Sequence, residues 1–476
     1  TSTIKVDTIS ENTSANGVSI DGVTIKDGGI TITSTINGTA IKPADATNFF
    51  NGILISEDAN TGTLNDAGFN TGIGHSVFDV LTTGDQNTTV GAGSMAKLTS
   101  GLRNTGIGSF ALDELVDGDD NIAVGDNALV ALTTGNRNIG IGRATADGFD
   151  TESDNLAIGH NALGGGVAGG EYNVAIGNYS LDALTSADNN VVIGYEAGGT
   201  LQTSGENVII GSYAVSTGVL TGTQNIAIGR LAGQDLTSAT KNVIMGWSAA
   251  KNATTSDGNT IIGHSANGAG VLTGNNNVVI GKLAGNDMTS ASANVLIGED
   301  AGANLTTGAD NIVIGQGAGE ALTSPDRSIF IGKNAGNGHD TENDNIGIGF
   351  EAIGGSVASG EKNVAIGNYS LDSLTSGDNN VAVGYNAGTG IQTSSLNTIV
   401  GDAAAALLAT GDGRNTVIGK DCFNAGSTPL TTGSNNIALG ERTKMSASNG
   451  TFQFVIGSNV TSNGSSTTTI GYDTTE

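Results

Sequence analysis

The stretch Asn173-Val174-Ala175-Ile176-Gly177 decides the fold, because a phrase of this form returns along almost the whole chain. A large aliphatic residue precedes an aligned glycine 24 times between residues 73 and 471, mostly at intervals of 17 or 18 residues. A short fixed period is typical of a solenoid, in which one coil cannot bury its apolar side alone. The sequence therefore predicts an all-β, parallel β-solenoid (β-roll) of about 24 coils with a 17–18-residue period.

The repeat also divides the chain. Residues 1–60 do not follow it, and alternating segments at 4–9, 17–25 and 28–32 predict short strands joined by glycine turns in a separate β-rich segment. Pro43 and the pair Phe49 and Phe50 mark the predicted junction. Residues 61–457 form the predicted solenoid domain, and residues 458–476 the terminal coil and an acidic cap.

Each coil contains two apolar pieces separated by polar turns. One ends in Ile-Gly, and the other is centred on phrases such as Leu184-Thr185-Ser186. Both pieces are predicted to be strands, which gives a flattened coil. A regular Thr array is also a feature of ice-binding solenoids, although the 18-residue coils interrupt it here.

Composition excludes several classes of partner. The chain has 46 acidic and 18 basic residues, a formal charge of -28, 76 Gly and 3 Pro. Such a field repels phosphate backbones and anionic lipid headgroups, so we expect no nucleic acid and no membrane insertion. No apolar run is long enough to span a bilayer, and the first residues lack the apolar core of a secretory signal. The single cysteine, Cys422, is expected to be a small buried hydrophobe.

The three residues before each glycine suggest how the strands face. The last is always large and aliphatic and the residue two earlier is mainly β-branched, so we predict that both point into the coil. The middle residue then points outward, yet it is never charged. A face of this kind is expected to pack against sister chains in a homotrimer. The predicted interchain face comprises Ala123, Ala157, Ala175, Val192, Ile209, Ala227, Ile244, Ile261, Val279, Leu296, Val313, Phe330, Ala365, Ala382 and Ile399.

An Asn opens 21 of the 24 phrases. Asn tolerates turn conformations and forms ladders, so a stack of turn residues is predicted, in which each amide bonds to backbone or to the next Asn. The predicted ladder includes Asn173, Asn190, Asn207, Asn225, Asn242, Asn259, Asn277, Asn294 and Asn311. Asp residues such as Asp120 and Asp188 often precede it, and such a column of carboxylates could attract Ca²⁺, although solvated turns are the favoured interpretation.

Other candidate chemistry is weak. Residues 164–169 match a dinucleotide-binding pattern by glycine content alone, with no following helix. His75, His160 and His264 follow repeat glycines but lie too far apart in coil number to share a metal within one chain, which leaves an axial site shared by three chains. Asp182 with Glu196 is one possible acid–base pair for a polysaccharide-cleaving enzyme, but Trp247 is the only Trp available for sugar stacking. No catalytic, metal or cofactor site is predicted.

Longer copies are superimposed on the coil repeat. Residues 150–211 reappear at 340–401, an offset of 190, and residues 218–263 similarly return at 270–315. Coil duplication therefore sets the length, which suits a spacer better than a catalytic domain.

The phrases Asn-Val-Ala-Ile-Gly and Leu-Thr-Thr-Gly resemble the head repeats of trimeric autotransporter adhesins, a left-handed parallel β-roll. The resemblance covers residues 70–471, although the coil here is longer and a heptad stalk is lacking. Residues 2–9 and 16–25 look like the N-terminal segment of tail-fibre and appendage proteins of tailed bacteriophages, especially marine ones.

That second resemblance implies an N-terminal segment bound to other virion proteins and a distal end that meets the bacterial surface. The sequence-based hypothesis is thus a structural, non-enzymatic fibre on a virion tail or appendage. It would bind a bacterial surface glycan or protein receptor. The alternatives are a bacterial trimeric surface adhesin and a polysaccharide depolymerase tailspike.

Overall fold

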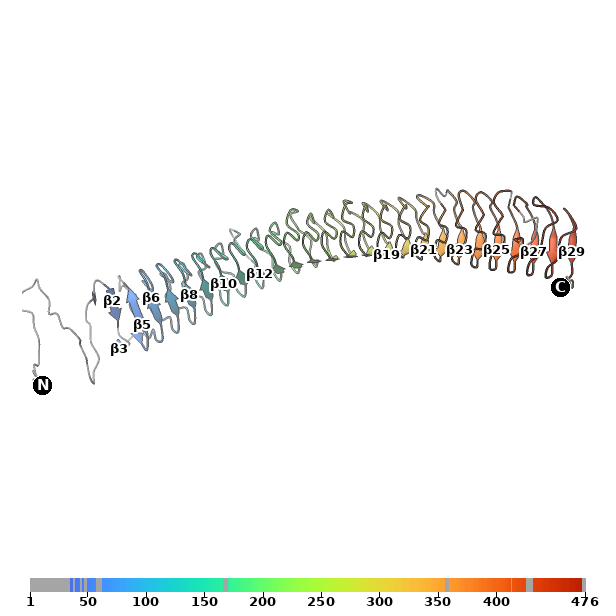
Figure 1. The fold of residues 1–476 in the computed structure, drawn as a ribbon. Helices are drawn as coiled ribbons and strands as arrows, with labels where there is room; N and C mark the ends of the chain where they lie inside the picture. The colour runs from blue at the N-terminus through green and yellow to red at the C-terminus, as the bar shows by residue number, and fades with distance from the viewer. Residues whose placement is uncertain are drawn as a thin grey trace, which may run out of the picture.

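The computed structural model is a long, gently curved rod built from one stack of coils (Figure 1). It describes residues 35–36, 39–42, 45–46, 49–56, 62–165, 170–355, 359–411, 413–424 and 431–472. These residues contain strands and turns and no helix. The strands predicted at 4–9, 17–25 and 28–32 and the acidic end at 473–476 lie outside the described residues.

Five strands precede the regular coils: β1 (Thr35–Ile36), β2 (Thr39–Lys42), β3 (Asp45–Ala46), β4 (Phe49–Phe50) and β5 (Ile53–Ser56). Each regular coil then contributes one strand of three residues. These are β6 (Thr71–Ile73), β7 (Thr88–Val90), β8 (Thr105–Ile107), β9 (Ile122–Val124), β10 (Ile139–Ile141), β11 (Leu156–Ile158), β12 (Val174–Ile176), β13 (Val191–Ile193), β14 (Val208–Ile210), β15 (Ile226–Ile228), β16 (Val243–Met245), β17 (Thr260–Ile262), β18 (Val278–Ile280), β19 (Val295–Ile297), β20 (Ile312–Ile314), β21 (Ile329–Ile331), β22 (Ile346–Ile348), β23 (Val364–Ile366), β24 (Val381–Val383), β25 (Thr398–Val400), β26 (Thr416–Ile418), β27 (Ile437–Leu439), β28 (Phe454–Ile456) and β29 (Thr468–Ile470).

From β5 to β29 every strand pairs in parallel with the next, in unbroken register. Val174 of β12, for example, lies opposite Val191 of β13. The stack begins at β5, slightly before residue 61, because β5 is already paired in parallel with β6 and in antiparallel with β2. Phe49 is buried in the first part of the core, at the junction predicted from the sequence. The parallel β-solenoid is thus the fold of the described chain.

The second strand predicted in each coil is absent from the described residues, where 27 strands form one sheet and β3 and β4 pair separately. The segment around Leu184 has an irregular backbone of turns and bends instead. The Thr185 N–H and hydroxyl both donate to the carbonyl of Gln202 in the next coil, at 2.9 and 3.0 Å. The neighbouring residues Tyr179 and Leu181 have positive φ angles of 58° and 51°, and this left-handed backbone cannot continue a strand.

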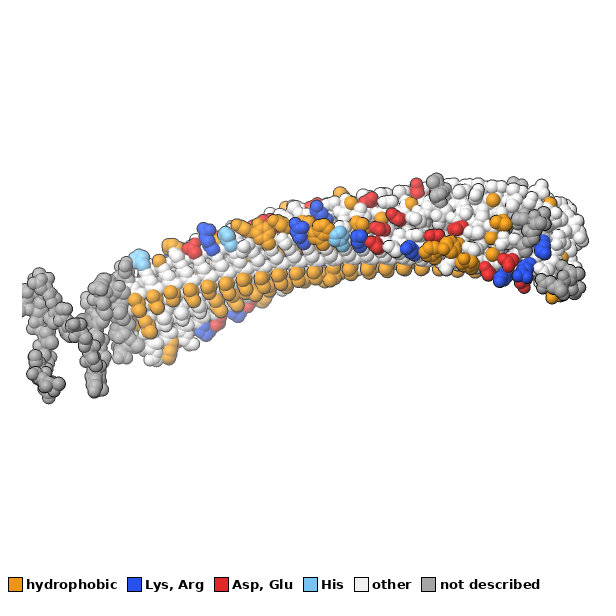
Figure 2. Space-filling model, in the orientation of Figure 1, with side chains coloured by type: hydrophobic (Ala, Val, Ile, Leu, Met, Phe, Trp, Pro, Cys, Tyr) orange, Lys and Arg blue, Asp and Glu red, His pale blue; other side chains and the backbone are white. Residues whose placement is uncertain are grey.

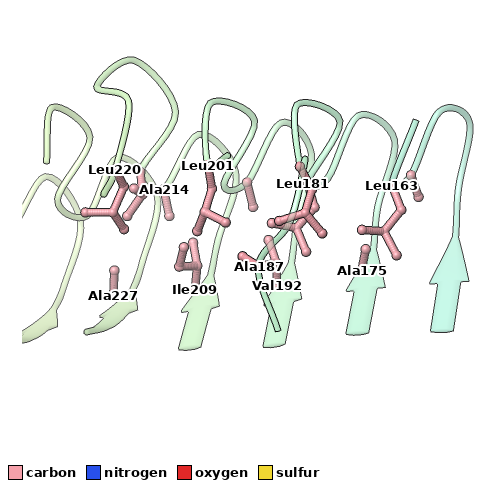
Figure 3. Packing of buried hydrophobic residues seen from close by; sticks show 14 of the residues in the cluster. Leu163, Ala175, Leu181, Ala187, Val192, Leu201, Ile209, Ala214, Leu220 and Ala227 are labelled. Atoms are coloured by element: carbon pink, nitrogen blue, oxygen red, sulfur yellow. The ribbon is translucent and has the colours of Figure 1, made fainter. Parts of the chain in front are cut away.

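The predicted orientation of the strand was wrong. The middle residue points into the coil, and the two flanking residues point out. All fifteen residues of the predicted interchain face are in the apolar core: Ala123, Ala157, Ala175, Val192, Ile209, Ala227, Ile244, Ile261, Val279, Leu296, Val313, Phe330, Ala365, Ala382 and Ile399. Figure 3 shows Ala175, Val192, Ile209 and Ala227 directed from their strands toward leucines on the opposite side of the coil.

The size of the middle residue explains this orientation. The middle position ranges from Gly140 to Phe330, because a narrow interior must share its volume between neighbouring coils. A Cβ at Gly347 would lie 3.1 Å from a ring carbon of Phe330, and one at Gly140 would lie 3.0 Å from Leu129 Cγ. Small residues thus stand where a neighbour is large, as close packing requires.

The repeat glycine is required by the approach of one coil to the next. Gly177 has a φ of 134°, and a Cβ there would lie 2.4 Å from the carbonyl oxygen of Gly194. Neither the backbone conformation nor the space admits a side chain. The same contact recurs at the other repeat glycines that have a following coil, which explains why they are invariant.

Replacing Gly177 by Ala should therefore open the stack locally. We expect Gly177→Ala to destabilise the protein by at least about 2 kcal/mol through backbone strain and steric overlap. The matched control is Gly471→Ala, because the added Cβ has only Val460 Cγ2 nearby, at 3.9 Å. Hydrogen exchange should rise around β12 and β13 in Gly177→Ala only. Equal protection in both variants would contradict this account.

The predicted Asn ladder is a continuous chain of hydrogen bonds inside the coils. The backbone N–H and the Nδ2 of Asn190 both donate to Asn173 Oδ1, at 3.0 and 3.1 Å. Asn207 repeats both bonds to Asn190 Oδ1, and Asn173 Nδ2 also donates to the carbonyl of Ala187. The bonds continue through Asn225, Asn242, Asn259, Asn277, Asn294 and Asn311. The amides are buried, so this ladder satisfies groups that would otherwise be costly to bury.

The natural exception at Ser328 offers a test of the ladder. Its N–H donates to Asn311 Oδ1 and its hydroxyl donates to the Glu342 carbonyl and accepts from Asn345 N–H, but serine lacks the second side-chain N–H that an asparagine would also donate to Asn311 Oδ1. Ser328→Asn should raise the free energy of unfolding by about 1 kcal/mol, and Asn190→Ala should lower it by about 1–3 kcal/mol. Denaturant unfolding followed by circular dichroism measures both changes. A destabilised Ser328→Asn would show that the ladder geometry is not transferable along the rod.

Candidate functional site

The outward side of the sheet is apolar along the rod. It is formed by the first and last residues of the strands β6 to β29, and we call it the sheet face. Ile226 and Ile312 on it are each 36% exposed, and most of the others are half-buried by their neighbours along the stack. Figure 2 shows these side chains as rows of hydrophobic atoms that follow the length of the molecule. Seven of the 24 first positions hold Thr, and the rest hold apolar residues.

The area of the sheet face can be compared with the apolar area that soluble monomers expose to water. Strands of three residues at about 3.3 Å per residue, repeated in 24 coils at about 4.8 Å, give a face of roughly 1,100 Å². Soluble monomers rarely expose a continuous apolar patch above about 300–600 Å². The sheet face also exceeds the roughly 800 Å² that one partner buries in a typical stable interface. It is therefore a candidate interaction surface.

A second feature is a row of aromatic side chains on the turns that follow successive repeat glycines. The first aromatic row consists of His160, Tyr179, Tyr195 and Tyr213 on four successive coils. Neighbouring ring centroids are 5.2, 6.1 and 5.4 Å apart. The planes of neighbouring tyrosine rings are inclined to each other by 84° and 73°. The rings therefore meet edge to face and are not stacked face to face. Tyr195 is 41% exposed.

Two carboxylates share a hollow with this row. The hollow has a volume of about 390 Å³ and is lined by Tyr179, Tyr195, Asp182, Glu196, Gly199 and Ser216. Burial raises the pKa of Asp182, a backbone hydrogen bond opposes this, and nearby Glu196 raises it further. The hydrogen bond with Glu196, helped by desolvation, raises the pKa of Tyr195 to about 12. The Tyr195 hydroxyl therefore stays protonated and can donate throughout the physiological range.

The long internal copy places a second aromatic row 190 residues further on. It contains Phe350, Tyr369 and Tyr385, with centroids 5.3 and 6.0 Å apart. Asp372 stands where the first copy has Asp182, but its Oδ1 accepts a hydrogen bond from the Thr389 hydroxyl. A different hollow, of about 140 Å³, lies between Asp372 and the preceding coils, where it is lined by Asn334, Asn337, Glu351 and Gly354 and by no ring of the row.

The histidines named in the sequence analysis lie on the same edge. His160 belongs to the first aromatic row, and His264 packs against Trp247 with centroids 4.5 Å apart. Within the described residues no three His, Cys, Asp or Glu side chains are grouped so that they could hold a metal ion.

The turn carboxylates make hydrogen bonds between coils. Asp120 accepts from Arg103 Nε at 2.6 Å, and this bond lowers its pKa. Asp188 Oδ1 accepts the N–H of Glu171 at 2.7 Å. With these partners the Asp residues join neighbouring coils, and this role needs no metal ion. The threonine hydroxyls, such as that of Thr185, donate to carbonyls of the next coil.

Two other candidates from the sequence are Cys422 and the glycine pattern at residues 164–169. Cys422 is buried beside Thr443, with Sγ 2.6 Å from Oγ1, and burial raises its pKa to about 11, which keeps the thiol protonated. The glycine pattern at 164–169 falls mostly outside the described residues. In the described part of the chain no helix has the length and apolar character needed to cross a bilayer.

Sequence reasoning found Asp182 and Glu196 but missed the tyrosines around them. The signal was available, because Tyr179, Tyr195 and Tyr213 follow consecutive repeat glycines by one or two residues. The single Trp made sugar stacking look poorly supported, whereas the aromatic row is built from Tyr. Similarly, Thr at the first strand position indicated an outward side chain.

No model of a known protein family matches the chain, and a search of curated proteins gives no match. The internal geometry of the rod therefore has to support any functional assignment.

One buried histidine occupies a position that is apolar in other coils, and its effect on stability can be measured. His339 occupies a core position that holds Leu184 or Leu322 in other coils, and neither ring nitrogen has a hydrogen-bond partner. Its Nδ1 lies 3.6 Å from Glu342 Oε2, and that carboxylate already accepts the backbone N–H groups of residues 340 and 341. We expect His339→Leu to raise the free energy of unfolding by about 1–3 kcal/mol.

Thermal unfolding at neutral pH measures this change, and Leu322→His in the preceding coil is the matched reverse control. That variant should lose stability. If His339→Leu unfolds at a lower temperature than the parent, the contact with Glu342 contributes more than the buried ring nitrogens cost.

Proposed function

We propose that this chain is a structural fibre that associates through its sheet face into a homotrimer. We further propose that the fibre belongs to the tail or appendage of a bacteriophage and attaches the particle to a bacterial cell. The observation that carries the proposal is the long sheet face, which is apolar at the last strand position of every coil from β6 to β29 and at 17 of the 24 first positions. An enzyme needs one site with its own set of residues, whereas the coils from β6 to β29 repeat the same packing.

Three copies related by a rotation axis would cover the sheet face economically. Each rod presents one such face along its length, and closed rotational symmetry buries equivalent faces without leaving an open end for further growth. Regular β-branched side chains suit such packing, because they are stiff and lose little rotamer freedom on burial. The turns that carry the aromatic rows would stay on the outside of the bundle.

The attachment role draws on the shape of the rod and on the resemblance of the N-terminal segment to phage fibres. At about 4.8 Å per coil, the 24 coils from β6 to β29 extend over roughly 110 Å. A rod of this length can hold binding surfaces well away from an anchored end, and three chains present each surface three times. The same features suit a bacterial trimeric adhesin, which remains the alternative within this class.

A polysaccharide depolymerase is a second candidate, favoured by one observation. Asp182 and Glu196 share one hollow, and burial raises the pKa of Asp182, as a general acid requires. Incubation with bacterial capsule or lipopolysaccharide separates the two functions. Release of oligosaccharides that stops in Asp182→Asn would favour the enzyme, and unchanged polymer length would favour the fibre.

Charge on the sheet face should prevent assembly. We expect the parent to sediment at three times the chain mass of 47.1 kDa, and the double variant Ile226→Lys with Ile312→Lys to sediment as a smaller species. The double variant Ser186→Lys with Ser290→Lys is the matched control, since it adds the same two charges at exposed positions away from the sheet. Circular dichroism must show intact coils in all three proteins. A well-behaved parent monomer would rule out the trimer.

The virion assignment has its own test. Antibodies raised against the purified rod should label the tail region of phage particles that contain this protein, as seen by electron microscopy. Labelling of a bacterial envelope in the absence of phage would favour the adhesin instead.

A further inference from the structure

We propose that the first aromatic row and its hollow form a binding site for an uncharged glycan chain. The site consists of Tyr179, Tyr195 and Tyr213 as a stacking surface, with Asp182 and Glu196 as hydrogen-bond acceptors. The proposal deepens the attachment function and rests on it only for the biological source of the glycan.

The rings suit the apolar face of a sugar. The C–H groups of a pyranose carry slight positive charge and are attracted to the negative face of an aromatic ring. Ring centroids recur every 5.2–6.1 Å along the row, close to the advance of a glycan chain per sugar unit. Because neighbouring tyrosine planes are inclined by 84° and 73°, a glycan lying along the rod would meet ring faces and ring edges alternately along its successive sugars.

The polar groups of the hollow suit sugar hydroxyls. A carboxylate accepts hydrogen bonds from O–H groups more strongly than a neutral acceptor does, and Asp182 and Glu196 provide two within one space of about 390 Å³. An apolar surface with a few converging polar groups is the usual composition of a small-ligand site.

Charge selects among glycans. The hollow contains two carboxylates and no basic side chain, and the whole chain carries a formal charge of -28. Uronic acids, sialic acids and phosphorylated sugars would be repelled. Neutral hexoses, deoxyhexoses and N-acetylhexosamines are the sugars that this surface accepts.

The second copy shows what an obstructed version of the site looks like. Thr389 stands 190 residues after Gly199, and its hydroxyl occupies Asp372 Oδ1. At Gly199 the corresponding space is free, and a Cβ there would lie 3.3 Å from Asp182 Oδ1. Glu196 is likewise replaced by Asn386 in the second copy. Asp182 therefore keeps an open Oδ1 because Gly199 has no hydroxyl to donate to it, and the tyrosine row is also longer in the first copy, since Ala403 stands where the first copy has Tyr213.

The site is also placed where binding does not disturb the rod. Its tyrosines lie on the turn beyond the strand, and the sheet face remains available for association. Tyr195 Cα belongs to a segment held by coil-to-coil bonds, such as Tyr213 N–H to the Tyr195 carbonyl at 3.0 Å. The surface is therefore preorganised, which limits the entropy lost on binding.

The test uses the full chain on an array of immobilised bacterial-type oligosaccharides, neutral and acidic, followed by calorimetry with each soluble oligosaccharide that binds. We expect binding to neutral members only. Tyr195→Ala and Gly199→Thr should each weaken it by about tenfold or more. Gly199 has no positive φ angle, so the Gly199→Thr change needs no strained backbone. The matched control Tyr385→Ala should stay within about twofold of the parent.

Each outcome has a defined meaning. The proposal is overturned by binding restricted to acidic glycans, by no glycan binding, or by equal affinity in the parent, Tyr195→Ala and Gly199→Thr. Binding of a basic peptide that falls steeply with salt, without neutral glycan binding, would assign the surface to cations instead. Sedimentation of the same samples keeps the two proposals apart, because a trimer without glycan binding leaves the fibre intact and removes only this site.

Discussion

Each coil rests on the next at the glycine that ends its strand, and the rest of the structure depends on that contact. At Gly177 the backbone approaches the carbonyl of Gly194 so closely that a methyl group would overlap it. This approach fixes the coil spacing, which in turn brings Asn173 and Asn190 within hydrogen-bond distance. The left-handed residues Tyr179 and Leu181 cost about 1–2 kcal/mol each. Repeated hydrogen bonds between coils offset that cost only while the stack is in register.

A coil of this size cannot bury both sides of its strand. Its interior accepts one side chain per strand, such as Ala175, opposite a leucine of the turn. The flanking Val174 and Ile176 must then face outward whatever their hydropathy. The apolar sheet face is therefore a direct consequence of putting β-branched residues on a three-residue strand, and water is a poor environment for it. Fold and association are linked through the same three positions.

The sequence was sufficient for the fold class, the period, the register and the Asn ladder, because these follow from the spacing of Gly and Asn alone. It was not sufficient to tell which side chains of each strand point into the coil and which point outward. Both sets of positions are apolar, and period-two alternation is symmetric between them. The deciding property was size: the middle position varies from Gly140 to Phe330, as a shared interior demands. The hollow beside Tyr195 was beyond prediction, since it depends on the absence of a side chain at Gly199.

At the turn after the repeat glycine the stack does not dictate the side chains, in contrast to the positions that contact a neighbouring coil. The glycine itself, the Asn and the middle residue are each held by a contact with a neighbouring coil. The two positions that follow the glycine instead hold residues as different as Arg230, Trp247 and Glu299. The second of them has a left-handed backbone, as at Tyr179, but the stack does not select its side chain, so a run of related side chains on consecutive coils requires another cause. The tyrosines from Tyr179 to Tyr213 are such a run, and recognition of a ligand is a cause that acts on exposed side chains without affecting the register beneath them.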